Sequence, residues 1–231
     1  DYIGGFPEHP HRGMETITYM KAGRMRHRDH MGNEGVIGPG DVQWMTAGKG
    51  VLHSEMPEQE SGLLHGFQLW LNLPAAEKMK SAGYRDIRAK DIPFEELMTG
   101  GKVAMIAGEV IINNETTLKG VLPKLTTQPV LMDVDLSENE NLNLSFNSEY
   151  PALVYVIEGE LAGEDAIQKG SMGIFSEGES LILTAGEKGA SLLILSGKPL
   201  KEPIVQYGPF VMNTRVEIDQ AINDFRMGRL V

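Results

Sequence analysis

Paired histidines near the N-terminus are the part of this sequence best suited to chemistry. All six histidines lie within the first 65 residues, and two pairs of ligand-type residues stand at positions i and i+2: His9 with His11, and His53 with Glu55. Because alternate residues of an extended strand point to the same face, each pair can present two side chains to one point. Two such strands facing each other form a pocket of three imidazoles and one carboxylate, which is a mononuclear metal site by its ligand chemistry.

The ligand types leave the identity of the metal open. Imidazole suits iron, copper, nickel, zinc and manganese, and one carboxylate favours the harder members of that series. In octahedral geometry four protein ligands leave two open positions, so such a site can take an anionic oxygen ligand and dioxygen together. The plainer alternative for each pair alone is two surface side chains on an edge strand.

The turns around the two pairs favour the metal site. The first pair is followed by Glu15 and a strand-like run, and the second pair follows the turn sequence Gly-Pro-Gly-Asp (38–41). A His-x-His pair, a Glu four residues later, and then a Pro-Gly turn and another His form the two-part motif of cupin barrels.

Longer stretches resemble one family, the pirins, which are iron-binding bicupins. The matching segments are FPEHPHRGMET (6–16), PGDVQWMTAG (39–48), GVLHSEMP (50–57), HGFQLWLNL (65–73) and YGPFVMNT (207–214). The resemblance implies that His9, His11, His53 and Glu55 ligate a single iron(II). Pirins normally carry a further N-terminal segment, whereas this chain opens at Asp1 without Met, so we expect that a segment is missing from that end.

Further residues are candidates for the same pocket. Within the resemblance, Glu55 both ligates the metal and accepts a substrate proton as a general base. Glu15 is expected to hydrogen-bond a ligand histidine, with a purely structural role as the alternative. His27 lies on an adjacent predicted strand that approaches the pocket, and Gln43 and Gln68 lie on flanking strands, from which they can line it.

The fold class predicted is all-β, with two cupin (jelly-roll) barrels in tandem. Short apolar or alternating segments separated by Gly and Pro turns run through both halves of the chain. We place the metal-binding barrel at 1–118 and a second barrel at 119–231, closed by an amphipathic helix over 214–228 that begins at a capping box. No histidine follows His65, so the second barrel is expected to be metal-free.

Composition excludes several classes of protein. The chain has no cysteine, which rules out disulfides and thiolate chemistry. Its formal net charge of −11 disfavours direct binding to nucleic acid. No apolar run approaches the roughly 20 residues that cross a bilayer, so we expect no membrane association and a cytoplasmic location.

Two classes of function remain after this reading. The resemblance implies an iron(II)-dependent dioxygenase that opens a flavonol such as quercetin, a small planar hydroxylated aromatic, with O2. The alternative is a non-catalytic, redox-sensing regulator that holds iron and binds a protein partner, either a transcription factor or a metabolic enzyme. A third reading is a cupin that uses zinc or nickel, with copper or manganese as further substitutes, on a substrate other than a flavonoid.

Overall fold

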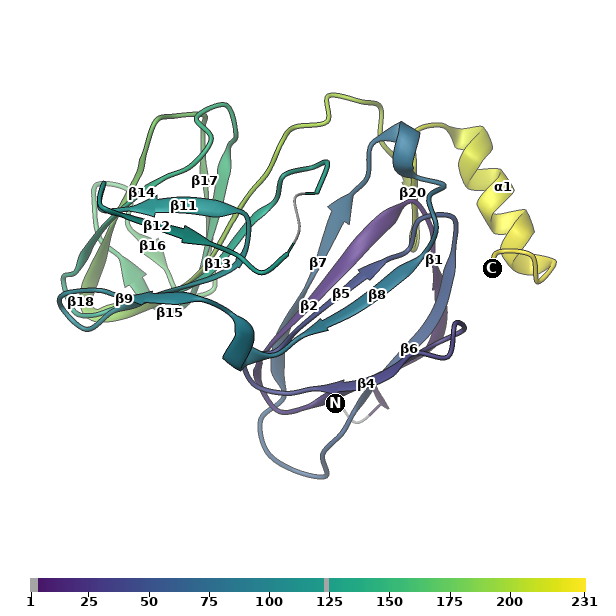
Figure 1. Ribbon diagram of the computed structural model, residues 1–231, viewed down its shortest axis with the longest axis horizontal. Helices are drawn as coiled ribbons and strands as arrows, with labels where there is room; N and C mark the ends of the chain where they lie inside the picture. Colours follow the sequence, from purple (N-terminus) through teal and green to yellow (C-terminus); the bar gives the residue numbers. More distant parts are fainter. Residues whose placement is uncertain (1–3, 123–124) are drawn as a thin grey trace. The chain divides into compact units, whose positions relative to one another are not determined.

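A computed structural model describes residues 4–122 and 125–231. The described chain is built almost entirely of β-strands, and its one α-helix is α1 (Arg215–Arg226). The predicted all-β class with a C-terminal helix is therefore confirmed (Figure 1). The chain divides into two compact units, one formed by residues 1–89 and 200–231 and the other by residues 90–199.

Two four-stranded antiparallel sheets make up most of the first unit. One sheet has the order β1 (Phe6–His11), β6 (Val51–Pro57), β3 (Met25–Asp29), β4 (Glu34–Ile37). The other has the order β7 (His65–Asn72), β2 (Met14–Ala22), β5 (Val42–Thr46), β8 (Gly83–Ile87). A short hairpin of β19 (Val205–Tyr207) and β20 (Phe210–Met212) belongs to the same unit.

The strand patterns follow from the two faces of each sheet. In β6 the buried residues alternate, and Val51, His53 and Glu55 all point inward. Such alternation normally buries apolar side chains, so inward-pointing His and Glu mark a polar site inside the barrel. At the start of β2, Gly13 supplies the positive φ of +82° that the tight turn from β1 requires.

The C-terminal helix belongs to the first unit, although we expected it to close the second barrel. It begins at a capping box in which Thr214 and Glu217 exchange hydrogen bonds, as predicted. Buried Arg12 holds this end of the chain, because its Nη1 pairs with Asp224 at 2.8 Å and its Nη2 donates to the Leu230 carbonyl at 3.3 Å. Ile218 and Ala221 of the helix pack in one apolar cluster with Phe210, Met212 and Leu230.

The second unit begins at Lys90, earlier than the expected boundary at residue 119. The reason is strand pairing, because β10 pairs with β13 and β11 pairs with β14, which ties residues 102–112 into the second sheet. Its strands are β9 (Phe94–Glu96), β10 (Lys102–Ala107), β11 (Glu109–Ile112), β12 (Thr116–Lys119), β13 (Val130–Leu136), β14 (Asn141–Ser145), β15 (Ala152–Leu161), β16 (Ile167–Gln168), β17 (Met172–Phe175) and β18 (Leu181–Ser196).

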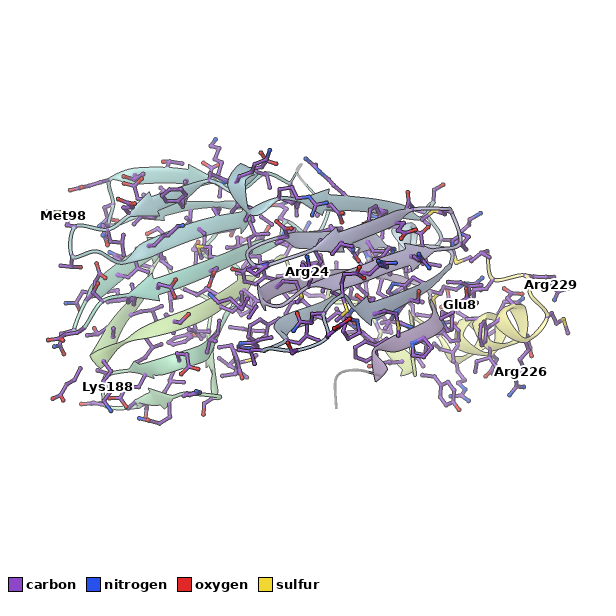
Figure 2. The ribbon with its side chains drawn as sticks, turned by 90° about the horizontal axis from the view of Figure 1, so that it is seen from below. Glu8, Arg24, Met98, Lys188, Arg226 and Arg229 are labelled. Carbon is purple, nitrogen blue, oxygen red and sulfur yellow. The ribbon has the colours of Figure 1, made fainter. Side chains whose placement is uncertain are left out.

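Valine, leucine and isoleucine side chains from these strands form one apolar core in the second unit. Charged side chains of both signs lie on the surfaces, and Figure 2 labels Glu8 and Arg24 on the first unit and Lys188 on the second. None of the helices in the described ranges is long and apolar enough to cross a membrane.

Candidate metal centre

Three predicted ligands meet between two neighbouring strands. β1 runs antiparallel to β6 with His9 directly opposite His53, and His11 projects from the same face of β1 two residues later. The ring centroids lie 5.0 Å apart for His9 and His11, 4.3 Å for His9 and His53, and 5.0 Å for His11 and His53. One nitrogen of each ring lies within 4.8 Å of the other two, a spacing that can hold one metal ion.

The hydrogen bonding of these rings fits a bound cation. Within the described residues, both ring nitrogens of His11 and Nε2 of His53 lack a hydrogen-bond partner. Both side chains are buried. Buried polar atoms are normally paired, so nitrogen lone pairs gathered within 4.8 Å of one another call for a cation between them. The Nδ1 of His9 donates to the Pro7 carbonyl at 2.8 Å, which leaves its Nε2 lone pair for ligation.

The electrostatics keep two of the imidazoles neutral. Burial, together with the neighbouring His9, lowers the pKa of His11 to about 4. Burial lowers the pKa of His53 to about 2, with contributions from the rings of His11, His9 and His27. Since neutral imidazole is the form that ligates metals, these two side chains are ready to bind near neutral pH.

Glu55 lies beside this group but is not part of the set whose ligand atoms fall within 4.8 Å of one another in the described chain. Its side chain is buried, and each carboxylate oxygen accepts one hydrogen bond. Thr18 Oγ1 donates to Oε1 at 3.1 Å and Gln68 Nε2 donates to Oε2 at 2.7 Å. A carboxylate oxygen can accept more than one bond, so both oxygens retain lone pairs for a cation or a proton.

A row of polar residues crosses the sheet of β7, β2, β5 and β8 in the first unit, with one residue on each strand. Gln68 pairs with Thr18, Thr18 with Gln43, and Gln43 with Asp86 across four neighbouring strands. Gln43 Nε2 donates to Asp86 at 3.4 Å and to Tyr84 Oη at 3.3 Å, and both of these acceptors are on β8. Gln68, one of the two predicted pocket residues in this row, is the one that donates a hydrogen bond to Glu55.

The other two predicted residues have different partners. Buried Glu15 accepts a hydrogen bond from Thr46 at 2.7 Å and pairs with Lys80 at 3.2 Å, so the structure gives it the structural role that we held as the alternative. His27 is buried on β3 and contacts a ligand ring, with its Nδ1 3.3 Å from Nδ1 of His53.

Three residues around the site were missed in the sequence. Thr18 holds Glu55, Asp29 lies 3.5 Å from His27, and the ring of Tyr84 lies 4.7 Å from the ring of His27. Alternation along 14–22 and 25–29 indicates which residues share a face. Choosing among them also requires the strand pairing, which the sequence does not state.

Exposed aromatic side chains flank the histidines. The Trp70 ring meets His11 edge to face at 5.5 Å, and its Nε1 donates to Gln68 at 3.3 Å. The Phe6 ring lies 6.4 Å from that of His9. Trp70 is 45% exposed and Phe6 is 60% exposed, so both present ring surface to solvent beside the site.

A separate cavity of about 590 Å³ lies in the second unit. Its lining is mostly apolar, and it contains one acidic and one basic side chain, Glu109 and Lys119. These two form an ion pair with each other at 3.1 Å. No histidine lines the cavity, and we place the chemistry at the histidines of the first unit.

Comparisons with known proteins agree with this fold. The family model described as Pirin matches residues 1–71, and that of the Pirin C-terminal cupin domain matches residues 131–231. A Pseudomonas aeruginosa protein named "Putative quercetin 2,3-dioxygenase" is 49% identical over all of this chain and 81% of its own length. Human "Pirin" is 40% identical over 96% of this chain and 77% of its own.

The solved structures agree as well. A crystal structure of quercetin 2,3-dioxygenase from Acinetobacter baumannii superposes with a TM-score of 0.89 at 38% identity. The match covers 98% of this chain and 79% of that protein.

Proposed function

Because this chain belongs to the pirin family, we propose that it is an iron(II)-dependent dioxygenase that opens a flavonol such as quercetin with O2. The observation that carries the proposal is the group of three imidazoles, two of them buried with unpartnered nitrogens. Relatives and a solved structure that carry the quercetin 2,3-dioxygenase name support the choice of reaction.

The proposed metal ligands are His9, His11 and His53, with Glu55 as the fourth. Three neutral imidazoles and one carboxylate leave a divalent ion with a net charge near +1, which suits an anionic oxygen ligand. Bound iron(II) supplies Lewis acidity toward the enol oxygen of the substrate and redox reactivity toward dioxygen.

Glu55 is the proposed general base. Its buried carboxylate accepts bonds from Thr18 and Gln68, which fix the direction of the side chain. One oxygen of this carboxylate would accept the substrate hydroxyl proton. The donors Thr18 and Gln68 would hold the carboxylate in place while the proton moves.

The flanking aromatic rings suit a planar substrate. Phe6 and Trp70 expose ring surface on either side of the His9 and His11 pair. Offset stacking or edge-to-face contact with such rings stabilises a flat hydroxylated aromatic by about 0.5–1.5 kcal/mol per pair. These contacts orient the substrate hydroxyl toward the histidine group.

The test is oxygen uptake by protein reconstituted anaerobically with iron(II) and then given quercetin and air. We expect uptake with release of carbon monoxide, and loss of both in His53→Ala and Glu55→Ala. His30→Ala is the matched control, because His30 is outside the three-histidine group of the described chain and its Nδ1 accepts from the Leu52 amide.

The outcomes separate the two classes of function. Uptake that depends on His53 and Glu55 supports the dioxygenase. One bound iron per chain without uptake contradicts the dioxygenase and favours the regulator, whose binding to a protein partner follows the oxidation state of iron.

A further inference from the structure

Strand β3 places two buried side chains behind one of the ligand histidines. β3 pairs with β6 so that Asp29 lies directly opposite His53, and His27 lies opposite Glu55. Residues opposite each other in a sheet share a face, so all four side chains point into the barrel. The His27 and His53 side chains are about 1% exposed, and that of Asp29 is 0% exposed.

These side chains form a chain of polar contacts. Nδ1 of His53 lies 3.3 Å from Nδ1 of His27, and Nε2 of His27 lies 3.5 Å from Oδ2 of Asp29, at the long end of the hydrogen-bonding range. The carboxylate is itself fixed, because Oδ1 accepts from the amides of Met31 and Asn33, and Oδ2 accepts from Asn33 Nδ2. Asp29 is therefore a rigid acceptor next to one nitrogen of His27.

The proton positions along this chain follow from that acceptor. A carboxylate beside Nε2 of His27 favours the proton on Nε2, so Nδ1 of His27 carries a lone pair. That lone pair accepts the Nδ1 proton of His53, and Nε2 of His53 then keeps its own lone pair. If His27 instead carried its proton on Nδ1, His53 would have to place its proton on Nε2, where it blocks ligation.

We infer that His27 and Asp29 are positioning residues that hold His53 in the tautomer whose Nε2 lone pair faces His9 and His11. The unpartnered Nε2 of His53 in the described structure is the atom that this arrangement prepares. The inference rests on the proposed metal centre and adds two residues to it. Outer partners of this kind typically change metal affinity 10–100-fold.

Asp29→Asn tests the inference with little change in shape. Its Oδ1 can keep the bonds from the amides of Met31 and Asn33. An NH2 group replaces Oδ2, so the bond from Asn33 Nδ2 is lost and the NH2 group lies beside His27. The new NH2 group and the Nε2 proton of His27 are then two donors that face each other. We therefore expect the His27 proton to move to Nδ1, where it faces the Nδ1 proton of His53. Competition against a chromophoric chelator should show zinc(II) binding weakened by about 10–100-fold.

Asp41→Asn is the control for loss of a negative charge. Asp41 also caps a turn of the first unit, accepting from the Gly38 amide at 3.0 Å, but pairs with Arg88 and not with a histidine. We expect its zinc(II) affinity to equal that of the wild type.

A second pair of variants, His27→Asn and His27→Leu, places side chains of nearly equal volume at position 27. Only the Asn side chain has an oxygen that can accept the proton of His53.

The second readout is the tautomer itself. Long-range 15N NMR of zinc(II)-loaded, histidine-labelled protein should show His27 protonated on Nε2 and His53 on Nδ1, and His27→Asn should bind zinc(II) more tightly than His27→Leu. Wild-type affinity in Asp29→Asn, or a His27 protonated on Nδ1 in the wild type, would overturn the inference. Failure of the wild type to bind zinc(II) would overturn the proposed centre beneath it.

Discussion

His11 bears the clearest mark of a ligand among the six histidines. Both of its ring nitrogens lack a partner within the described chain, and its side chain is about 1% exposed. A buried imidazole in that condition loses hydrogen bonds to water without replacing them, which costs roughly 1–3 kcal/mol. A bound metal ion removes that cost.

We therefore expect His11→Ala to abolish tight metal binding. The loss should exceed the roughly 10–100-fold effect of an outer partner, because a direct ligand is removed. Anaerobic titration of iron(II), read by metal content after gel filtration, measures it. His30→Ala should bind one ion per chain like the wild type, and wild-type binding by His11→Ala would contradict the ligand assignment.

Lys78 gives a pH-dependent prediction away from the metal. Its ammonium is buried and donates to Asn72 Oδ1 and to the carbonyls of Gly13 and Val211 at 2.7–2.9 Å. Burial lowers its pKa to about 8, while the charges of Glu202 and Glu217 oppose the shift. Between about pH 8 and the ordinary lysine value of 10.5, the unfolded chain binds more protons than the folded one.

The free energy of unfolding should accordingly rise with pH across that interval, measured as the difference between wild type and Lys78→Met. Urea unfolding followed by circular dichroism at a series of pH values gives this difference. Lys49→Met, at an exposed position, is the control. If this difference stays constant or falls as the pH rises, the hydrogen bonds to the carbonyl acceptors affect the pKa of Lys78 more than burial does.

At the scale of elements, the turn between β1 and β2 fixes the first ligand pair. Gly13 has φ +82°, and a Cβ at this position would collide with the carbonyl oxygen of Val211 on β20. Gly32 has φ +84° with nothing within 4 Å of an added Cβ. The two glycines therefore share a backbone conformation and differ in what surrounds them.

Gly32→Ala should lower the free energy of unfolding by about 1–2 kcal/mol, the cost of a left-handed conformation. Gly13→Ala should lower it by about 2–5 kcal/mol, because overpacking adds to the same cost. Chemical denaturation of both variants compares them. Equal losses would mean that the contact with Val211 relaxes freely and does not constrain the turn.

Local sequence patterns predicted many features at the scale of elements. The remaining features depend on which strands pair. The i, i+2 spacing of His9 with His11 was sufficient to predict that the two side chains share one face of a strand, because alternation is a property of one strand. The role of Glu15 depended on Thr46 and Lys80, which lie 31 and 65 residues further along the chain. Contacts at that separation depend on strand order, which hydrophobic periodicity does not encode.

The helix α1 shows the same limit. Its capping box was read correctly from Thr214 and Glu217. Its assignment to the first unit depends on Arg12, whose partner Asp224 is 212 residues away. Chain order alone suggested the second barrel, whereas the helix pairs with Arg12 and packs against the apolar side chains of β20.

At the scale of the molecule, the candidate metal centre lies in one unit. The candidate ligands lie within residues 1–89, and the sequence of 90–199 holds no histidine. Metal binding stabilises the folded unit that binds it by RT ln(1 + [L]/Kd), about 2.7 kcal/mol at a hundredfold excess over Kd. The second unit gains nothing directly from the ion.

Hydrogen exchange with and without zinc(II) should therefore show new protection in residues 4–89 and 200–231. Peptides from residues 90–199 are the internal control and should exchange at the same rate in both states. Equal protection of both units would contradict a site confined to the first. Zinc(II) avoids oxidation during the measurement.

The reaction itself is tested most directly with 18O2. Iron(II)-loaded protein given quercetin under labelled oxygen should release carbon monoxide and yield a ring-opened product that contains two labelled atoms, as dioxygenation requires. Mass spectrometry of the product, with His53→Ala as the control, reads the result. A product with one labelled atom or none, or the same product from His53→Ala, would contradict a flavonol dioxygenase at the three-histidine centre.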